Sequence, residues 1–201
     1  MVGGLSEDTA PADPIVLFQD WFAAAQRAGL SLPESVAVAT ASSDGAPSAR
    51  MMLLKGVDHR GFVFFTNYGS RKAADLTENP RAALVFHWPT LQRQVRVDGD
   101  ATQLSAEESA AYFRTRQRGS QTGAWASRQS QPLDNRSTLK RRVAEIERRF
   151  EGGDVPAPGF WGGYRVAPRR IEFWQGRINR LHDRLAYTME QENWTRIRLY
   201  P

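Results

Sequence analysis

The sequence predicts a mainly β protein of the α+β class, in which a closed or nearly closed antiparallel barrel carries a few peripheral helices. The first observation is that residues 35–100 and 164–201 consist of short β-rich runs separated by turns. The second is that few segments show the spacing of an amphipathic helix. Many strands at short spacing with few helices favour a barrel over a parallel sheet with crossover helices.

The chain has 201 residues, of which 41% are hydrophobic, enough for one domain with a substantial core. Residues 1–12 are small and polar and are expected to form a flexible tail. Residues 13–201 are expected to form a single domain.

The first helix is expected to begin at Asp13-Pro14, since aspartate is a good N-cap and proline suits the first helical position. Gly29 supplies the stop. Apolar residues recur on one face of this helix, at Leu17, Phe18, Trp21, Phe22 and Ala25.

Five runs within residues 35–100 are expected to be antiparallel strands, with turns at SDGA and DHRG. Between two of them, SRKAADLTENP contains helix formers and predicts a short helix ending at Asn79-Pro80. The five runs are SVAVATAS, RMMLLKGV, FVFFTN, AALVFHW and RQVRVDGD.

A capping box of Ser105 and Glu108 predicts a second helix that continues through Tyr112 and Arg116. A third helix is expected to end at Gly152-Gly153, from the apolar spacing of Leu139, Val143, Ile146 and Phe150. The runs YRVAPRRIEFWQG and LAYTMEQENWTRIRLYP return to the strand period, and the last two strands are expected to form a hairpin.

Composition excludes several classes of protein. No apolar run approaches the roughly 20 residues that cross a bilayer, and no signal segment is present, so no membrane partner and a cytoplasmic location are expected. The absence of cysteine excludes disulfides and a cysteine nucleophile and suits a reducing compartment. The three histidines lie far apart in the sequence, so no metal site is expected.

The net charge of +5 is spread through the chain, which favours small anionic ligands over nucleic acid. The glycine-rich stretches EGGD and WGGY lack the GxGxxG spacing and the strand-to-helix context of a dinucleotide site. FAD and NAD are therefore poor candidates.

The segment TNYGSRK predicts a phosphate cradle. Ser70, Arg71 and Lys72 open the short helix, where backbone N–H groups and the helix dipole attract an anion. The positive end of the helix dipole would repel the two cations Arg71 and Lys72, unless a bound anion compensates their charge. Arg50 and Lys55 lie five positions apart in a strand and are expected to point to opposite faces, so this segment alone favours two solvated strand ends over a ligand site.

Tyr112 and Arg116, at i and i+4, could grip a second phosphate with Ser120, or could form an exposed helix edge. The run IEFWQGRINRLHDR would suit a planar anionic heteroaromatic ligand. There, Trp174 would pack on the ligand, Arg180 and Arg184 would supply charge, and His182 would hydrogen-bond. A surface cluster of Arg180, Asp183 and Arg184 is the alternative.

Taken together and in order, six segments resemble the pyridoxine/pyridoxamine 5'-phosphate oxidase family: RMMLLK, FVFFTNYGSRK, RQVRVDG, RGSQTGAWASRQS, FWGGYRV and IEFWQGRINRLHDR. The resemblance covers residues 12–201. It implies an FMN-binding split β-barrel and a homodimer with FMN at the interface. It also implies oxidation of pyridoxine or pyridoxamine 5'-phosphate to pyridoxal 5'-phosphate by O2, with release of H2O2, in vitamin B6 biosynthesis and salvage.

The resemblance also assigns residues. It implies FMN contacts at Arg50, Met51, Met52, Leu53, Leu54, Lys55, Phe65, Thr66, Arg71, Lys72, Gln94, Gln129, Ser130, Trp174 and Arg184. It implies substrate contacts at Lys55, Tyr112, Arg116, Ser120, Arg180, Leu181 and His182, of which Arg180 and His182 would be catalytic. Phe65 stands where relatives carry tyrosine, and the beginning MVGGLSEDTAPADP lacks the arginine-rich segment that helps cover the substrate in relatives.

Two rival functions remain open on the sequence. One is an oxidase of another aromatic compound, such as a dihydrophenazine precursor, which would not need the second phosphate grip. The other is a carrier of flavin or B6 phosphate that does not turn over.

Overall fold

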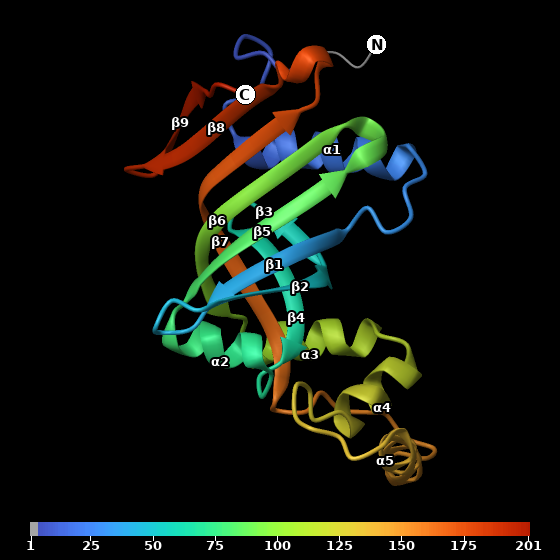
Figure 1. Cartoon of the computed structure of the whole chain (residues 1–201). Coiled ribbons are helices and arrows are strands. Elements are labelled where there is room, and N and C mark those ends of the chain that lie inside the picture. Colours follow the sequence, from blue (N-terminus) through green and yellow to red (C-terminus); the bar gives the residue numbers. More distant parts are fainter. Residues whose placement is uncertain (1–3) are drawn as a thin grey trace.

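The computed structural model describes residues 4–201; residues 1–3 of the expected tail lie outside it. Figure 1 shows a curled sheet with α2 to α5 at one end and the β8–β9 hairpin at the other. The elements are α1 (Pro14–Arg27), β1 (Ser35–Ala41), β2 (Pro47–Leu53), β3 (Gly56–Asp58), β4 (Gly61–Asn67), α2 (Arg71–Glu78), β5 (Arg81–Trp88), η1 (Pro89–Leu91), β6 (Arg93–Gln103), α3 (Ala106–Thr115), α4 (Arg118–Ala126), α5 (Arg136–Arg149), β7 (Trp161–Gln175), η2 (Ile178–Arg180), β8 (Asp183–Glu190) and β9 (Asn193–Arg198).

The predicted antiparallel barrel is confirmed. The main sheet runs in the order β2-β1-β5-β6-β7-β4-β3, so β2 and β3 occupy opposite edges although they are consecutive in the chain. Only Leu54 and Lys55 separate them. The backbone N–H of Leu54 donates to the carbonyl of Glu34 at 2.9 Å, and that of Lys55 donates to the carbonyl of Val63 at 2.8 Å. This two-residue link joins the two edges and nearly closes the sheet.

Strand β7 is long enough to have two different neighbours on one side. Its first part, residues 161–166, pairs with β4, and residues 170–175 pair with β8. Along its other side β6 follows both parts, with a register shift between Asp98 and Gly99. Such a bulge bends a strand and increases its twist. The barrel and the β8–β9 hairpin are therefore two parts of one nine-stranded sheet, joined through β7.

Helix α1 fills one side of the barrel. Asp13 caps it, since its side chain accepts a hydrogen bond from the N–H of Ile15 at 2.8 Å, as predicted. Phe18 is fully buried and packs edge-on against Phe62 and Phe86, with ring centroids 4.8 Å away in each case. Full burial of such a ring stabilises the fold by roughly 1.5–3 kcal/mol. Gly29 follows the helix in the left-handed conformation, as expected of a stop signal.

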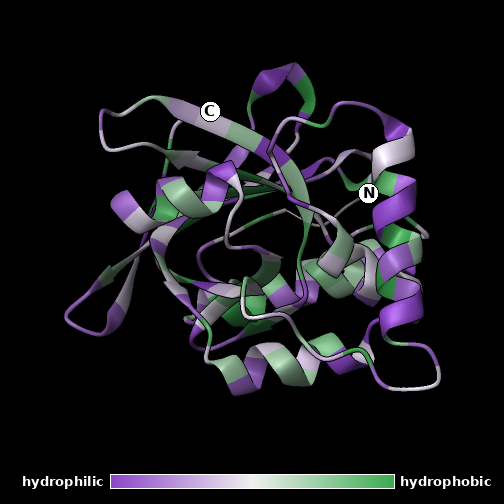
Figure 2. Ribbon diagram, turned by 90° about the horizontal axis from the view of Figure 1, so that it is seen from below, coloured by the Kyte–Doolittle hydropathy of each residue, from purple (hydrophilic) through white to green (hydrophobic). Residues whose placement is uncertain are grey.

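The later helices pack at the other end of the barrel. The capping box at Ser105 and Glu108 is confirmed, with reciprocal bonds of 3.0 and 3.1 Å. Helix α4 was not predicted, because its sequence RGSQTGAWA contains two glycines and few strong helix formers. Helix α5 is confirmed, and hydrophilic residues predominate in it (Figure 2). None of its residues is buried.

Residues 4–12, assigned to the expected tail, lie along the C-terminal hairpin. Leu5 is buried, and the hydroxyl of Tyr187 donates to the carbonyl of Pro11 at 2.9 Å. Glu7 forms an ion pair with Arg198. No helix within residues 4–201 is long and apolar enough to cross a membrane.

Candidate active site

An open cavity of about 1040 Å³ lies where β2, β4, α2, α3 and α4 meet. It collects most of the residues that the sequence predicted for ligand binding. Those that line it are Arg50, Met51, Met52, Leu53, Lys55, Phe65, Thr66, Arg71, Lys72, Tyr112, Arg116, Ser120, Gln129 and Ser130. Leu54 is buried beneath the wall and does not line the cavity.

Lys72 is the cation whose surroundings most clearly indicate an anion-binding position. Its side chain is buried, and Nζ donates to the hydroxyls of Thr66 at 2.9 Å and Ser70 at 3.2 Å. No carboxylate among residues 4–201 forms an ion pair with it. Burial, and then the charge of Arg50, lower the pKa of Lys72 from 10.5 to about 8. A bound phosphate would restore the favoured charged state.

Arg50 is held beside this cradle by a buried network. Its guanidinium donates to Thr40 at 2.8 Å and to Ser48 at 2.7 Å, and it lies 3.8 Å from the carboxylate of Asp75. The hydroxyl of Thr40 in turn donates to Asp75 at 2.6 Å. Neither Thr40 nor Asp75 was among the residues predicted for the site. Asp75 stands on α2 four residues after Arg71, and its helix position facing the sheet was the available signal.

The expected divergence of Arg50 and Lys55 is wrong. Strand β2 ends at Leu53 and β3 begins at Gly56, so Lys55 lies in the link between two strands and not within one. The strand period no longer applies across such a break. As a result both cations line the same cavity.

A second cation position lies across the cavity. Helix α3 ends at Thr115, and Arg116 is extended (φ −74°, ψ 147°), so the predicted helical i, i+4 pair of Tyr112 and Arg116 is wrong in its geometry. The two residues nevertheless line the cavity together with Ser120, which α4 carries.

The environment of Arg116 suits an anion. Its guanidinium carbon lies 4.7 Å from the ring centre of Trp161, and burial lowers its pKa. Its Nη1 is buried without a hydrogen-bond partner among residues 4–201. Buried donors are nearly always paired, so this one points to a missing acceptor. Beside it, Tyr112 stacks on Phe65 with centroids 3.9 Å apart, and burial raises the pKa of Tyr112.

Trp161 belongs to the segment FWGGYRV, but it was not predicted to contact a ligand. It forms the apolar floor of this cavity, stacking on Phe65 with centroids 5.3 Å apart. At the rim, Gln129 accepts hydrogen bonds from the Thr66 hydroxyl at 3.0 Å and the N–H of Asn67 at 3.3 Å. The cavity thus combines aromatic walls with the cations Lys72, on α2, and Arg116, after α3.

The remaining predicted residues form a second group, the hairpin cluster, near the junction of β6, β7 and β8. Trp174 lies opposite Gln94 on one side and opposite Arg184 on the other, and the ring of His182 is 4.5 Å from that of Trp174. The members are Gln94, Trp174, Arg180, Leu181, His182 and Arg184. None of them lines the cavity described above.

Arg184 is oriented by the buried carboxylate of Glu172, a residue that was not predicted for the site. Its Nε donates a hydrogen bond to one oxygen of Glu172 at 2.9 Å, and its Nη2 forms an ion pair with the same oxygen at 2.8 Å. Its Nη1 donates to the carbonyl of Tyr200 at 2.8 Å. Glu172 is buried and also lies within 4 Å of Arg96 and Arg170. Its place within the strand IEFWQ, where the neighbouring residues are apolar, was the available signal.

Comparison with known proteins gives the family. The sequence model described as "Pyridoxamine 5'-phosphate oxidase" matches residues 22–150, and "Pyridoxine 5'-phosphate oxidase C-terminal dimerisation region" matches residues 161–201. The chain is 63% identical over 198 residues to a pyridoxine/pyridoxamine 5'-phosphate oxidase of Rubrobacter xylanophilus, covering 98% of this chain and 91% of that one. It is 56% identical to the protein of the same name from Psychromonas ingrahamii, over 94% of this chain and 87% of the other.

The solved structures agree. PhzG from Burkholderia lata, determined with tetrahydrophenazine-1-carboxylic acid, superposes with a TM-score of 0.93 at 34% identity, covering 100% of this chain and 99% of that chain. An FMN-binding protein from Nostoc punctiforme that is related to pyridoxamine 5'-phosphate oxidase superposes with a TM-score of 0.77 at 16% identity. The match covers 96% of this chain and 100% of that chain, and it shows the shared fold. The dimerisation match supports a homodimer. This chain belongs to the pyridoxamine 5'-phosphate oxidase family.

Proposed function

We propose that the protein is an FMN-dependent pyridoxal 5'-phosphate synthase. It would oxidise pyridoxine or pyridoxamine 5'-phosphate with O2, releasing H2O2 and, from the amine, ammonia, in vitamin B6 biosynthesis and salvage. The observation that carries the proposal is one cavity with two separate, uncompensated cation positions, at Lys72 and at Arg116. A cofactor phosphate and a substrate phosphate would account for both.

The cradle residues fit a flavin mononucleotide. Lys72, Arg71 and Arg50 would hold the phosphate, and the start of α2 would add backbone N–H groups. Thr66 and Gln129 are hydrogen-bonded to each other. Together with the residues of β2 that line the cavity, they would contact the rest of the FMN molecule. FMN, when bound, supplies two-electron redox chemistry with O2 as the final acceptor.

The substrate phosphate would bind on the other side of the cavity. Arg116, with its unpaired Nη1, would supply the main charge, and Lys55, Tyr112 and Ser120 would complete the grip. A fixed phosphate places the ring of the substrate at a defined distance from the wall. The main contribution of these residues is therefore orientation.

The hairpin cluster would complete the site in a homodimer. We place Arg180, Leu181 and His182 of one subunit over the substrate in the cavity of the other, with Gln94, Trp174 and Arg184 against FMN. Two features support this: the dimerisation match covers residues 161–201, and Ile178 and Leu181 are 85% and 68% exposed in the single chain. Large exposed apolar residues are typical of an interaction surface.

Arg180 and His182 would act on the substrate ring. The guanidinium of Arg180 would stabilise negative charge, and His182 would hydrogen-bond a polar ring substituent. Their task would be to hold the reacting carbon of the substrate in the orientation that the redox chemistry of bound FMN requires.

Oxidase assays test the function directly. The purified, FMN-loaded protein should release H2O2 from pyridoxamine 5'-phosphate and produce an equal amount of pyridoxal 5'-phosphate. Binding without turnover would identify a carrier instead. Turnover of tetrahydrophenazine-1-carboxylic acid, the compound in the Burkholderia lata structure, with no turnover of either B6 phosphate, would identify an oxidase of another aromatic compound instead.

Mixing two inactive variants tests the shared site. Lys72→Met would damage the cavity and Arg184→Ala would damage the hairpin cluster. In a two-fold dimer each site would take one part from each subunit, so a mixed dimer would keep one intact site. Random mixing should then restore about a quarter of the wild-type activity. Two variants of the cavity, Lys72→Met with Arg116→Ala, are the matched control, and their mixture should show no more activity than the two variants show separately.

A further inference from the structure

The turn between β7 and β8 has a backbone conformation that needs external support. Asn179 and Arg180 are consecutive, and both are left-handed, with φ of 56° and 61°. Residues with a Cβ atom disfavour this region, so it persists where surrounding contacts hold it. Ile178 and Leu181 are exposed, so apolar packing within the chain does not provide the support.

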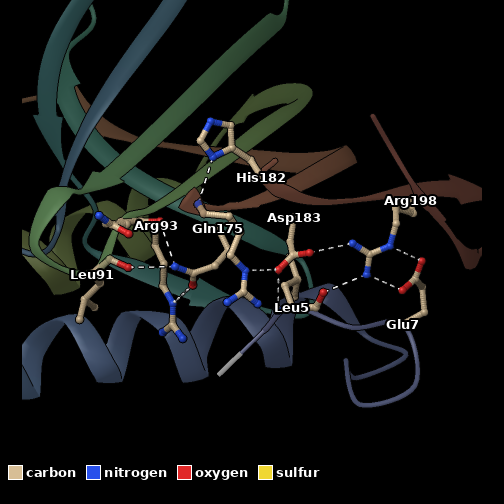
Figure 3. A network of polar contacts seen from close by, with 10 residues as sticks. Leu5, Glu7, Leu91, Arg93, Gln175, His182, Asp183 and Arg198 are labelled. Atoms are coloured by element: carbon tan, nitrogen blue, oxygen red, sulfur yellow. Dashed lines mark hydrogen bonds and ion pairs between the residues drawn. The ribbon is translucent and has the colours of Figure 1, made fainter. Parts of the chain in front are cut away.

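Polar contacts hold both ends of the turn (Figure 3). At the β7 end, the side chain of Gln175 donates to the carbonyls of Leu91 and Gln92 at 3.1 and 3.2 Å. At the β8 end, the carboxylate of Asp183 accepts hydrogen bonds from three separate parts of the chain. The donors are Nε of Arg177 at 2.7 Å, Nη1 of Arg198 at 3.0 Å and the N–H of Leu5 at 3.3 Å.

Arg177 connects this carboxylate to the imidazole of His182. Its side chain binds Asp183, and its backbone N–H donates to Nδ1 of His182 at 3.1 Å. A ring nitrogen that accepts a hydrogen bond carries no proton, so a neutral His182 must carry its proton on Nε2. Nε2 has no partner among residues 4–201, so it is free to donate to a ligand.

The residues near the N-terminus close over the same ion pair. A Cβ atom on Gly4 would overlap Nη2 of Arg177, so the backbone passes directly against the guanidinium. Glu7 binds Arg198, the second cation on Asp183. Burial disfavours the ionised form of Asp183, but the hydrogen bonds and charges of Arg177 and Arg198 outweigh it and lower its pKa below the ordinary value.

We propose that Asp183 is a positioning residue. By holding Arg177, it keeps the N–H of that residue on Nδ1 of His182 and fixes the imidazole as the Nε2–H tautomer. Asp183 acts through Arg177 and does not touch the substrate. The catalytic consequence rests on the proposed function, in which His182 donates to the substrate ring; the structural part, the tautomer, does not depend on it.

Nitrogen NMR of the histidine side chains in the full-length protein tests the structural part. The chain has three histidines, so a His182→Gln variant identifies the signals of this one. The wild type should show neutral His182 with its proton on Nε2 alone. Asp183→Asn should add the Nδ1–H form, whereas Glu190→Gln, an exposed carboxyl on the same strand, should not. An unchanged tautomer in Asp183→Asn overturns the proposal.

A second variant covers the case in which Asp183→Asn does not fold. Arg177→Met keeps the backbone N–H and removes the ion pair with Asp183, so it should produce the same mixture of tautomers. If Arg177→Met kept the pure Nε2–H form, the link from Asp183 to His182 would be refuted.

Kinetics separate this proposal from the proposed function. With FMN-saturated protein, Asp183→Asn should lower kcat by about tenfold and change KM little, because it disturbs orientation and not binding. Asp183→Glu, which retains the charge, should recover part of the loss. A changed tautomer with normal kcat would support the positioning role and contradict the catalytic role of His182.

Discussion

The buried ammonium of Lys72 should make FMN binding weaken as the pH rises. Without ligand, burial and the charge of Arg50 lower the pKa of Lys72 to about 8. A phosphate beside Nζ favours the protonated form, so the pKa rises again in the complex. FMN affinity should therefore be constant below pH 8 and fall as the pH increases beyond 8. The limiting slope is about tenfold per pH unit, or about 1.4 kcal/mol.

Titration of flavin-free protein with FMN between about pH 7 and pH 9, followed by flavin fluorescence, measures this slope. Riboflavin, which has no phosphate, is the matched ligand control and should show no such slope. Lys72→Met should bind FMN more weakly and remove the slope, whereas Lys140→Met, a change on the surface of α5, should keep it. A slope that persists in Lys72→Met would refute the assignment of Lys72 to the phosphate.

The lowered pKa of Lys72 also affects the free energy of unfolding, which should change with pH in the opposite direction to FMN affinity. The unfolded chain holds the Lys72 proton up to about its ordinary pKa of 10.5, whereas the folded protein releases it near 8. Between these values the unfolded state binds more protons, so the free energy of unfolding of the flavin-free protein should rise with pH. The contribution of Lys72 is the difference between wild type and Lys72→Met in urea denaturation at each pH. A difference that falls over this range would contradict the pKa shift.

Three further predictions follow from the same structure. Arg116→Ala should raise KM for the phosphorylated substrate more than it lowers kcat, since a phosphate contact is similar in the ground and transition states; steady-state kinetics would show the reverse if Arg116 served chemistry. Arg180→Ala and His182→Ala should lower kcat with normal FMN content, and full kcat in both would make the turn purely structural. Phe18→Ala should reduce the free energy of unfolding by about 3–5 kcal/mol, because the ring is fully buried between α1 and the sheet; a loss below 1 kcal/mol in urea denaturation would contradict that packing.

Elements with strong local signals were predictable from the sequence. Asp13-Pro14 and the apolar spacing after it define α1, and Ser105 with Glu108 defines the start of α3. Helix α4 lacked such signals, and its formation depends on tertiary contacts. One of these is the hydrogen bond from the side chain of Arg118 to the carbonyl of Gly153 at 2.8 Å, which links α4 to the segment after α5.

The site was predictable in its parts but not in its arrangement. The anion cradle at Ser70 to Lys72 follows from a local rule about helix N-termini. The approach of Lys55 to Arg50 depends on a link between opposite edges of the sheet, which strand periodicity cannot show. Thr40 and Asp75 meet through a contact 35 positions apart in the sequence, and short-range spacing carries no information about such pairs. For the hairpin cluster, the sequence could name the residues but could not show that they lie outside the cavity of their own chain.

The change of neighbour along β7 has a consequence for how such chains can vary in evolution. Residues 161–166 belong to the barrel and residues 170–175 to the hairpin, and a single continuous strand sets the offset between them. Deletion of one residue between them would turn every side chain beyond it to the opposite face, which would bury Arg170 and expose Ile171. A change in the length of this stretch is therefore incompatible with the fold. Length variation is therefore expected in exposed loops away from the cavity, such as residues 42–46. It is not expected within β7 in any chain that keeps both the barrel and the hairpin.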